Sequence, residues 1–457
     1  MCRWVFYLGQ QELLLEDLLI KPNHAIVEQV NVRFLPGLYY GLEESDKEAM
    51  AASNNYLNAH GFGVAWYTTK LSEFDPSIKG MHPALFKTIA PISTDIAFHQ
   101  LCGHTASRCV LSHIRAASFP PVVEINNHPF VFGKYSFMHN GGVNCFDIIR
   151  FDVLRRIQQL QNIVKAHPHA VSSAVDGNYI FGIRGNADTE HVATLYFAHL
   201  DIVKAGIITA TQSNKNRESS GHGAAASAPT VDYDGDSTDA MLLALINTIN
   251  DIHRIQRIHK VGPFTPGDDR VGNSLNFCIS DGGEQMLVLR WKDALKGFPP
   301  SLYLSLTAGE KLNRKYHPEP PKPAAANDVH NEDVQIDTLE KLVERYENMP
   351  PSRQGRHVIV GSEPCTRDVE DWGLFNPNQC VALDKSGKLR IIDMAKFFRE
   401  GREHEFHKHQ FSHVLDHISN NPWMDKTASD SIGISEHTVG LPQGESYPVF
   451  EVDFQLK

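Results

Sequence analysis

The sequence predicts an α+β protein, because runs of short strands flank a central stretch of amphipathic helices. Aromatic and β-branched runs next to glycine, such as residues 1–8 and 61–67, are typical of strands. Residues 147–166 instead place apolar side chains at the i, i+3, i+4 spacing of a helix. A second helix with an apolar face is expected after Ser237, a favourable N-cap residue.

The remaining elements follow from the same patterns, and several predicted strands deliver polar residues at their ends. A helical turn or loop is predicted at 12–19, a helix or loop at 51–60, strands at 109–114 and 131–138, and a helix start at 186–190. Later strands are predicted at 275–280, 285–291, 302–305, 357–361, 379–383 and 388–392. Arg115 directly follows one strand, and Asn140 closely follows another.

Composition narrows the class of protein. The net charge of −11 argues against nucleic acid as the main partner, since a phosphate backbone attracts a basic surface. Seven cysteines without a C-x-x-C pair suit a reducing compartment. The N-terminal apolar stretch is too short for a signal peptide, and no apolar run reaches the ~20 residues of a membrane helix. We therefore expect a cytoplasmic protein that does not enter a membrane.

Two metal-site patterns are considered and not favoured. The acidic run at 232–236 resembles a calcium loop, but Ser237 stands where an EF-hand needs glycine and Leu243 where it needs glutamate. His409, His413 and His417 have the i, i+4 spacing of ligands on a helix, yet no H-E-x-x-H pattern occurs there. We expect neither a metal nor a cofactor.

Cys2 is the candidate nucleophile. Removal of Met1, which a small second residue permits, would leave Cys2 with both a thiol and a free α-amine. An α-amine titrates at about 7.7–8.0, so it can act as the base for its own thiol. On Cys2 alone, the interpretation as an ordinary cysteine near a chain end is favoured.

Four further residues fit one reaction at Cys2. Arg115 offers the guanidinium fork that suits an α-carboxylate, and Asp188 offers a negative charge for an α-ammonium group. The side chain of Asn140 and the N–H group of Gly141 form a donor pair suited to a tetrahedral oxyanion. Together they indicate attack on the side-chain amide of glutamine or another γ-glutamyl compound.

Each of these residues also has a structural interpretation. Asp188 could be the N-cap of the following helix, Arg115 a surface ion pair, and Asn140-Gly141 a hairpin turn. His128 and His139 could orient loops beneath the site, and Glu363 could be structural. The other six cysteines, at positions 102, 109, 145, 278, 365 and 380, are expected to be buried small residues.

The chain resembles the class II glutamine amidotransferases. The resemblance rests on five motifs in family order, which are Cys2-Arg3, His113-x-Arg115, Asn127-His128-Pro129-Phe130, His139-Asn140-Gly141 and Asp188-Thr189-Glu190. Segments 61–67, 300–303 and 362–366 look most like its amidohydrolase-type branch, which includes the fungal Dug-type subunit of a glutathione-degrading complex and a bacterial γ-glutamyl hydrolase. The resemblance implies an N-terminal-nucleophile hydrolase with a four-layer αββα sandwich.

The resemblance also implies the extent of the domain. It would cover residues 2–396, with flexible insertions at about 214–236 and 318–340, and residues 397–457 would form a polar, His-rich extension.

The family roles carry over by position. Cys2 is the nucleophile, Asn140 and Gly141 form the oxyanion hole, and the substrate-binding set is Arg115, Asp188, His128 and Thr189. The pattern departs from the family at Ala116, where the amidotransferases have tryptophan, and at Ser118-Phe119, where they have Thr-His. Because these positions shape the pocket, the donor substrate stays open.

The resemblance implies hydrolysis of glutathione or another γ-glutamyl peptide, together with a peptidase-like partner subunit. No synthase module is recognisable after residue 200. Two alternatives remain, a glutaminase subunit that passes ammonia to a separate synthase and an inactive scaffold subunit.

Overall fold

The structure is a computed structural model, and it describes residues 2–40, 42–54, 58–117, 121–166, 178–218, 237–265, 272–293, 299–315, 335–397 and 450–453. Its contacts divide the chain into two compact units. Unit 1 comprises residues 1–144, 267–393 and 448–457, and unit 2 comprises residues 145–266 and 394–447. Both units contain residues that the sequence assigned to one site.

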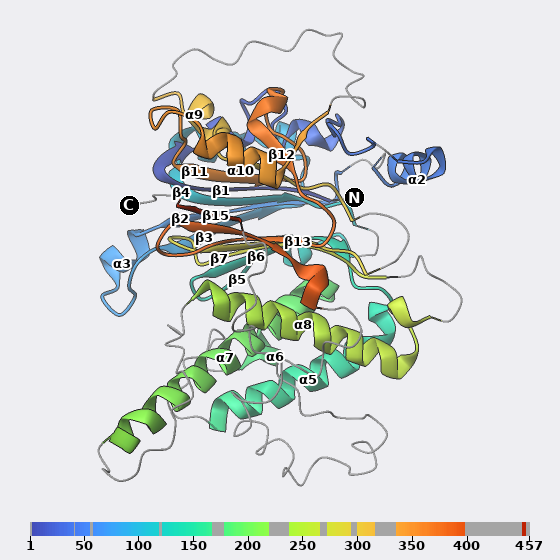
Figure 1. Cartoon of the computed structure of the whole chain (residues 1–457), viewed down its shortest axis with the longest axis vertical. Coiled ribbons are helices and arrows are strands. Elements are labelled where there is room, and N and C mark those ends of the chain that lie inside the picture. The colour runs from blue at the N-terminus through green and yellow to red at the C-terminus, as the bar shows by residue number, and fades with distance from the viewer. Residues whose placement is uncertain are drawn as a thin grey trace. The chain divides into compact units, whose positions relative to one another are not determined.

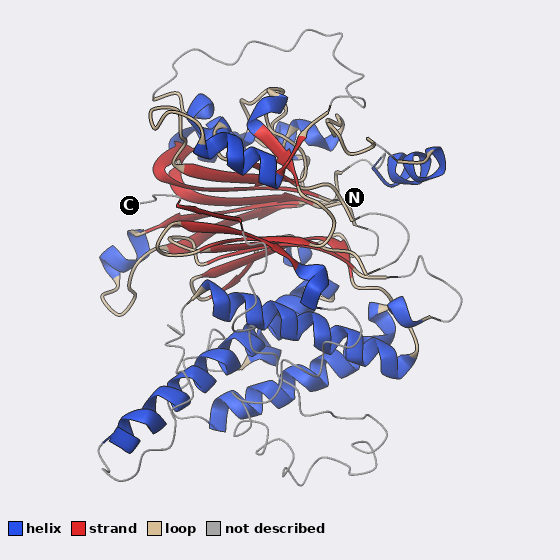
Figure 2. Cartoon of the chain, in the orientation of Figure 1, coloured by secondary structure: helices blue, strands red, loops and turns tan. Residues whose placement is uncertain are grey.

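Unit 1 contains two β-sheets (Figures 1 and 2). The eight-stranded sheet has the order β10 (Asp337–Thr338), β12 (Trp372–Leu374), β9 (Tyr303–Ser305), β11 (His357–Gly361), β1 (Arg3–Leu14), β4 (Ala106–Ile114), β2 (Phe62–Thr68), β3 (His82–Thr88). The seven-stranded sheet has the order β15 (Phe450–Asp453), β14 (Lys388–Asp393), β13 (Gln379–Leu383), β8 (Met286–Arg290), β7 (Ser274–Ser280), β6 (Tyr135–Gly142), β5 (Phe130–Phe132). All pairings are antiparallel except that of β10 with β12.

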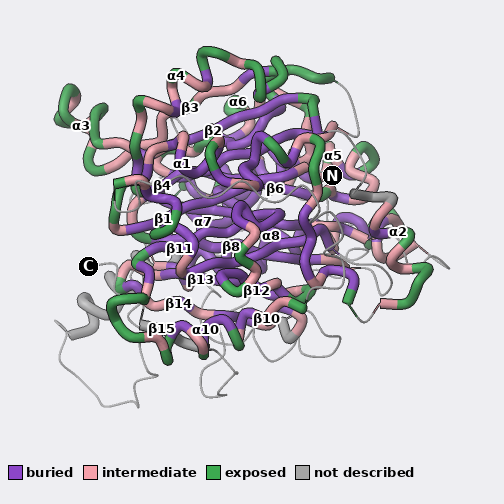
Figure 3. The backbone as a smooth tube through the Cα atoms, turned by 90° about the horizontal axis from the view of Figure 1, so that it is seen from above, coloured by how far each residue is buried: buried purple, intermediate pink, exposed green. Residues whose placement is uncertain are grey.

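The two sheets pack face to face through an apolar layer. Trp4, Phe6 and Leu8 of β1 point into this layer, because successive side chains of a strand alternate between its faces. Met138 of β6 and Cys278 of β7 belong to the same buried cluster from the opposite sheet. Figure 3 shows the strands of this layer coloured as buried along most of their length. The alternation fixes which residues of each strand face the other sheet.

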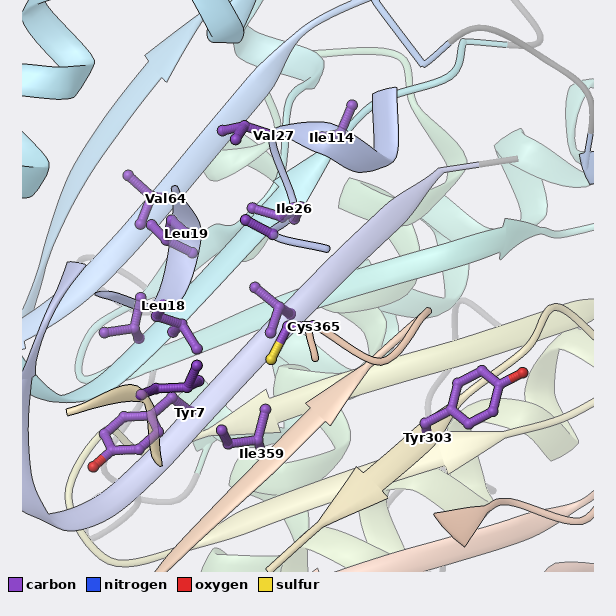
Figure 4. Close-up of a cluster of buried hydrophobic side chains, with 14 of the residues drawn as sticks. Tyr7, Leu18, Leu19, Ile26, Val27, Val64, Ile114, Tyr303, Ile359 and Cys365 are labelled. Carbon is purple, nitrogen blue, oxygen red and sulfur yellow. The ribbon is translucent and has the colours of Figure 1, made fainter. Parts of the chain in front are cut away.

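A layer of short helices covers the other face of the eight-stranded sheet. These are α1 (Leu15–Leu19), α4 (Ile96–His104) and α9 (Ala308–Leu312). Their apolar residues pack on the β1 side chains that alternate with the first set, Val5 and Tyr7. Figure 4 shows Tyr7, Leu18 and Leu19 among the side chains of this cluster. The described part of unit 1 therefore contains a helical layer and two sheets.

Helix α10 (Leu339–Glu347) joins the apolar layer between the sheets at one side. Its Leu339, Leu342, Val343 and Tyr346 are buried and belong to the same cluster as Trp4. Its backbone approaches β12 and β15, which lie at or near one edge of each sheet. Strand β10 directly precedes α10, so residues 337–340 of the insertion predicted at 318–340 belong to a strand and a helix.

Unit 2 is helical in its described part. It contains α5 (Phe146–Ala166), α6 (Tyr179–Gly182), α7 (Asp188–Glu218) and α8 (Thr238–His259). Asp251 of α8 is buried and joins three helices, because it accepts hydrogen bonds from Arg156 of α5 at 2.6 Å and His199 of α7 at 2.7 Å. The Ser237 hydroxyl accepts a bond from the Ala240 N–H group, which confirms the predicted N-cap.

Several sequence predictions need correction. Residues 131–138 form parts of two strands, β5 and β6, with Gly133 at φ +57° in the turn between them. The first strand runs to Leu14, beyond the expected end at residue 8. Helix α7 continues to Glu218, inside the insertion predicted at 214–236. Cys145 is only half-buried, whereas the other five cysteines expected in the core are buried.

Several elements of unit 1 lie outside the sequence predictions or only partly inside them. Helix α2 (Glu44–Asn54) begins before the helix or loop predicted at 51–60, and α3 (Lys70–Phe74) precedes the unpredicted strand β3.

All seven cysteines are free thiols. Among the described residues, no helix is long and apolar enough to span a membrane.

The Tyr67 hydroxyl ties the two sheets together, which makes it a test of the packing. From β2 it lies 2.8 Å from the Ser136 hydroxyl and 3.2 Å from the Ser280 carbonyl oxygen on the opposite sheet. We expect Tyr67→Phe to lower the free energy of unfolding by about 1–3 kcal/mol, since it strands buried polar groups. Urea denaturation measures this loss. Tyr7→Phe, which removes one local bond to the Gln11 carbonyl oxygen, is the control and should cost less; equal losses would contradict the bridging role.

Candidate functional site

Cys2 lies at the start of β1, and antiparallel pairing brings the end of β4 beside it. Arg3 pairs with Ile114, so the chain leaving β4 passes the thiol. The Ala116 N–H group donates a hydrogen bond to Sγ at 3.2 Å. Because Cys2 precedes Trp4 by two residues, its side chain is on the face of β1 that points toward the seven-stranded sheet. The thiol is half-buried.

The charge state of Cys2 reflects opposing influences. Burial raises the pKa of its thiol above the ordinary value of 9.0. The Ala116 N–H group and the positive charges of Arg115 and Arg3 act in the opposite direction on this pKa. Since burial has the larger effect, the thiol needs a base before it can attack a carbonyl carbon.

Arg115 is buried directly after β4. Its backbone N–H group bonds to the Gly61 carbonyl oxygen at 2.8 Å, which fixes the chain as it leaves the strand. Its guanidinium donates to the Pro121 carbonyl oxygen at 3.2 Å, so it is already oriented by the protein. The expectation of a surface ion pair is therefore wrong for this residue, which is 8% exposed.

Asn140 and Gly141 lie within β6, so the hairpin-turn interpretation is wrong. Asn140 follows Met138 by two residues and therefore shares its face toward the other sheet. The Asn140 side chain is buried, and neither its amide nitrogen nor its amide oxygen has a hydrogen-bond partner in the described part of the chain. Buried amides are normally paired, so this one is suited to a ligand.

Gly141 occupies a conformation that other residues avoid. Its φ is +145°, and a Cβ atom at this position would lie 1.9 Å from the Ser274 carbonyl oxygen of β7. Only glycine allows β6 and β7 to approach so closely here. Strands β1 and β6, which carry the two halves of the candidate site, also approach one another within unit 1.

Three buried histidines support the Asn140 segment. His113 Nε2 lies 3.1 Å from the His139 carbonyl oxygen, and His139 Nε2 lies 3.0 Å from the Ser274 carbonyl oxygen. His128 Nδ1 lies 2.8 Å from His113 Nε2. Because a carbonyl oxygen only accepts, the first two contacts require N–H at Nε2. His128 thus lies against another histidine, in agreement with its structural interpretation.

His113 and His128 are neutral at physiological pH. Burial lowers the pKa of His113 to about 3, and burial also lowers the pKa of His128 well below its usual value. Neutral imidazoles can hold the backbone before Asn140 without adding charge between the sheets.

Asp188 and Thr189 belong to unit 2, at the start of α7. The Asp188 carboxylate accepts bonds from the Thr189 N–H group at 2.7 Å and from its hydroxyl at 3.3 Å. Asp188 is the first residue of the helix, so it is not the N-cap that the structural interpretation suggested. Glu190 accepts bonds from the Arg184 and Gly185 N–H groups and fastens the preceding loop.

A second group of charged residues lies next to Cys2. The sequence did not predict that these residues contact one another. Arg3 donates through Nε to one oxygen of Glu363, and His24 Nε2 lies 2.8 Å from the other. Burial alone would raise the pKa of Glu363, but the Arg3 charge and the His24 hydrogen bond outweigh it and lower the pKa to about 2. The Ser362-Glu363-Pro364 motif was the sequence signal for this position.

The remaining candidates are a metal site and a surface cavity. Among the described residues, no group of histidine, cysteine and acidic side chains could hold a metal ion. His409, His413 and His417, Ser118-Phe119, and the acidic run at 232–236 lie outside the described residues. A surface cavity of about 470 Å³ is lined by residues of α10 and the following turn, including Lys341, Arg345 and Arg353. It contains none of the candidate catalytic residues.

Comparisons with known proteins agree with the sequence resemblance. The probable glutamine amidotransferase DUG3 of Saccharomyces cerevisiae is 30% identical over 203 residues, which cover 44% of this chain and 46% of that protein. A γ-glutamyl-hercynylcysteine sulfoxide hydrolase of Mycobacterium tuberculosis is 26% identical over 145 residues, 32% of this chain and 50% of the hydrolase. The chain spans about half the length of the curated relatives it matches. No family model matches the chain.

The glutamine aminotransferase class-II domain protein from Silicibacter pomeroyi superposes with a TM-score of 0.40 at 17% identity, covering 86% of this chain and 99% of that chain.

The lowered pKa of Glu363 predicts a specific acid sensitivity. The ionised carboxylate stabilises the folded state above its ordinary pKa of 4.5, and this stabilisation is lost as the pH falls from 4.5 through about 2. Its full size is about 3 kcal/mol. We expect the stability gap between the unmodified protein and an Arg3→Met/Glu363→Gln variant to change over this range, measured by urea denaturation at pH 6, 5, 4 and 3. A gap independent of pH would show that Glu363 does not titrate in this way.

Proposed function

We propose that this chain, which resembles the class II glutamine amidotransferases and among them the Dug type, hydrolyses a γ-glutamyl amide bond with Cys2 as its N-terminal nucleophile. The main support is the pairing of two features on facing sheets. The Cys2 sulfur accepts a hydrogen bond from the Ala116 N–H group, and the buried Asn140 amide has no partner in the described structure. A nucleophile and an unused donor of this kind suit acyl transfer.

The proposed reaction has two stages. After removal of Met1, the Cys2 α-amine takes the thiol proton through a water molecule, and Sγ forms a bond to the γ-carbonyl carbon. Asn140 Nδ2 and the Gly141 N–H group stabilise the resulting oxyanion. The C–N bond then breaks, and the leaving amine takes the proton from the α-ammonium group. Water hydrolyses the thioester, which releases glutamate and restores the thiol.

The remaining candidate residues would bind the amino-acid head group. Arg115 would pair with the α-carboxylate through its planar guanidinium. Asp188 would attract the α-ammonium group, with Thr189 fixing the Asp188 carboxylate through the two bonds described above. His128 would shape the pocket through its contact with His113. As part of the same proposal, the chain adopts the αββα sandwich that the resemblance implies.

Glutathione or another γ-glutamyl peptide is the proposed substrate, cleaved in a complex with a peptidase-like partner subunit. The names of the relatives support the γ-glutamyl class, since one is a probable glutamine amidotransferase and another a γ-glutamyl-hercynylcysteine sulfoxide hydrolase. Ala116, which replaces the family's tryptophan beside Cys2, leaves more room for a substrate larger than glutamine.

The first test separates the nucleophile from the oxyanion hole. Cys2→Ala removes the attacking atom and should abolish turnover. Asn140→Ala removes one oxyanion donor and should lower kcat about 10²–10³-fold with a smaller change in KM. Steady-state glutamate release measures both constants. Cys145→Ala, which changes a half-buried thiol in the other unit, is the matched control and should keep both constants. Normal kcat in Asn140→Ala would remove the oxyanion role.

The second test identifies the processed nucleophile and its substrate. Purified protein is incubated with a diazo-ketone analogue of glutamine, and the N-terminal peptide is analysed by mass spectrometry. We expect a peptide that lacks Met1 and carries one adduct on Cys2, with protection by glutathione stronger than by glutamine. Stronger protection and turnover with glutamine would favour the ammonia-delivering alternative. Retained Met1 with an unmodified thiol would favour the scaffold alternative.

A further inference from the structure

Two sequence motifs, at residues 300–303 and 362–366, have no role in the proposed chemistry. They contact one another beside the start of β1. Strand β11 pairs antiparallel with β1 on the side opposite β4, with Gly361 beside Val5. Ser362 and Glu363 therefore leave β11 beside the first residues of β1. Ser301, from the other motif, donates through its hydroxyl to the Ser362 carbonyl oxygen at 2.6 Å. The position of these motifs results from strand pairing, not from closeness in sequence.

We infer that Glu363 and Arg3 act as a positioning pair that holds the backbone of Cys2 in the orientation its attack requires. Arg3 Nη1 donates to the Cys2 carbonyl oxygen at 3.0 Å, while Arg3 Nε donates to Glu363. One guanidinium thus joins the nucleophile's own carbonyl group to a buried carboxylate. The inference deepens the proposed function and rests on it.

The carboxylate is itself fixed from two directions. The oxygen of Glu363 that does not face Arg3 Nε accepts a bond from the Phe34 N–H group at 2.7 Å and contacts His24 Nε2 at 2.8 Å. The side chains of Arg3 and Glu363 are 1% and 0% exposed. A planar guanidinium bonded at two of its nitrogens to fixed acceptors has little rotational freedom.

Hydrogen bonds along the backbone reinforce this arrangement. The Trp4 N–H group donates to the Ser362 hydroxyl at 3.1 Å, and the Ser362 N–H group donates to the Trp4 carbonyl oxygen at 2.9 Å. Trp4 is therefore held on both of its main-chain groups. The Arg3 bond extends the same control by two residues, to the carbonyl of Cys2.

An N-terminal nucleophile depends more on bonds that fix its backbone than an internal nucleophile does. Once Met1 is removed, Cys2 has one peptide bond, so only its carbonyl side connects it to the fold. Sγ and the α-amine both rotate with that residue, and a misplacement of about 1 Å can cost about 10²-fold in rate. The Ala116 bond to Sγ holds the side chain, and the Arg3 bond holds the carbonyl.

Stability alone is a weaker explanation for the pair. A buried ion pair often contributes little net stability, because desolvation of both charges offsets their attraction. Arg290 offers a comparison within the same unit, since it is buried and bonds to the Pro299 and Pro300 carbonyl oxygens, with no carboxylate contact among the described residues. In the described part of this fold, an arginine is thus buried without an acidic partner.

The test is a double-mutant cycle of Arg3→Met, Glu363→Gln and their combination. Removal of one partner leaves a buried charge unpaired and can impair folding, whereas removal of both partners leaves no unpaired charge. Each variant is checked for loss of Met1 by mass spectrometry and for thermal stability. We expect the double variant to fold and to lower kcat at least tenfold, with KM changed less than threefold. The two single effects on kcat should not multiply, because Glu363 acts through Arg3.

The control is Asp371→Asn. Asp371 is also a buried carboxylate of unit 1, bonded to the Thr307 hydroxyl at 2.9 Å and to Lys311 Nζ at 2.6 Å. Its replacement should lower the melting temperature and keep kcat within twofold. A double variant that keeps kcat within twofold, or single effects that multiply, would overturn the positioning role.

A second readout separates this inference from the proposed function. If the unmodified protein turns over no γ-glutamyl substrate, the proposed function fails, and the rate of Cys2 alkylation by iodoacetamide is measured instead. Cys145 in the same molecule is the internal reference, since it is also half-buried. We expect the ratio of Cys2 to Cys145 labelling to change at least fivefold in the double variant. An unchanged ratio would overturn the inference by itself.

Discussion

The antiparallel pairing of β1 with both of its neighbours is the constraint on which the candidate site depends. Because β4 and β11 run opposite to β1, both strands end where β1 begins. Ala116, which follows β4, consequently lies beside Cys2, whereas Ser362 and Glu363, which follow β11, contact Trp4 and Arg3. A parallel neighbour would have ended at the far side of the sheet. One topological choice thus surrounds the start of the chain with side chains from distant segments.

The packing of the two sheets adds the second half of the site. Alternation along β1 and β6 directs Cys2 and Asn140 into the layer between the sheets, in line with Trp4 and Met138. Most of that layer is apolar, so burying a polar group there lowers the stability of the fold unless the group is hydrogen-bonded. His113 and His139 meet this condition by donating to carbonyl oxygens, whereas the Asn140 amide lacks a partner in the described structure. Binding a substrate oxygen would satisfy that amide.

Local patterns predicted most elements, and their failures have physical causes. The run at 131–138 is rich in aromatic residues, and a single glycine inside a strand pattern is also typical of a bulge, so periodicity alone could not reveal that Gly133 turns the chain between β5 and β6. The apolar pattern at 12–19 could not show that β1 continues to Leu14, because strand length there depends on pairing with β4. Cys145 was expected in the core from its residue type, but its position just before α5 leaves it half-buried.

The sequence by itself determined the residue types of the candidate site and their order, because nucleophile, guanidinium, amide and carboxylate chemistry belongs to the side chains. It also determined the α+β class and the family resemblance, since periodicity and motif order are local properties of the chain. Only the tertiary structure decided that the Ala116 N–H group faces the Cys2 sulfur and that Glu363 reaches Cys2 through Arg3. Those contacts join residues 114 and 360 positions apart. Strand pairing and burial set such distances, and neither is encoded in any single stretch of sequence.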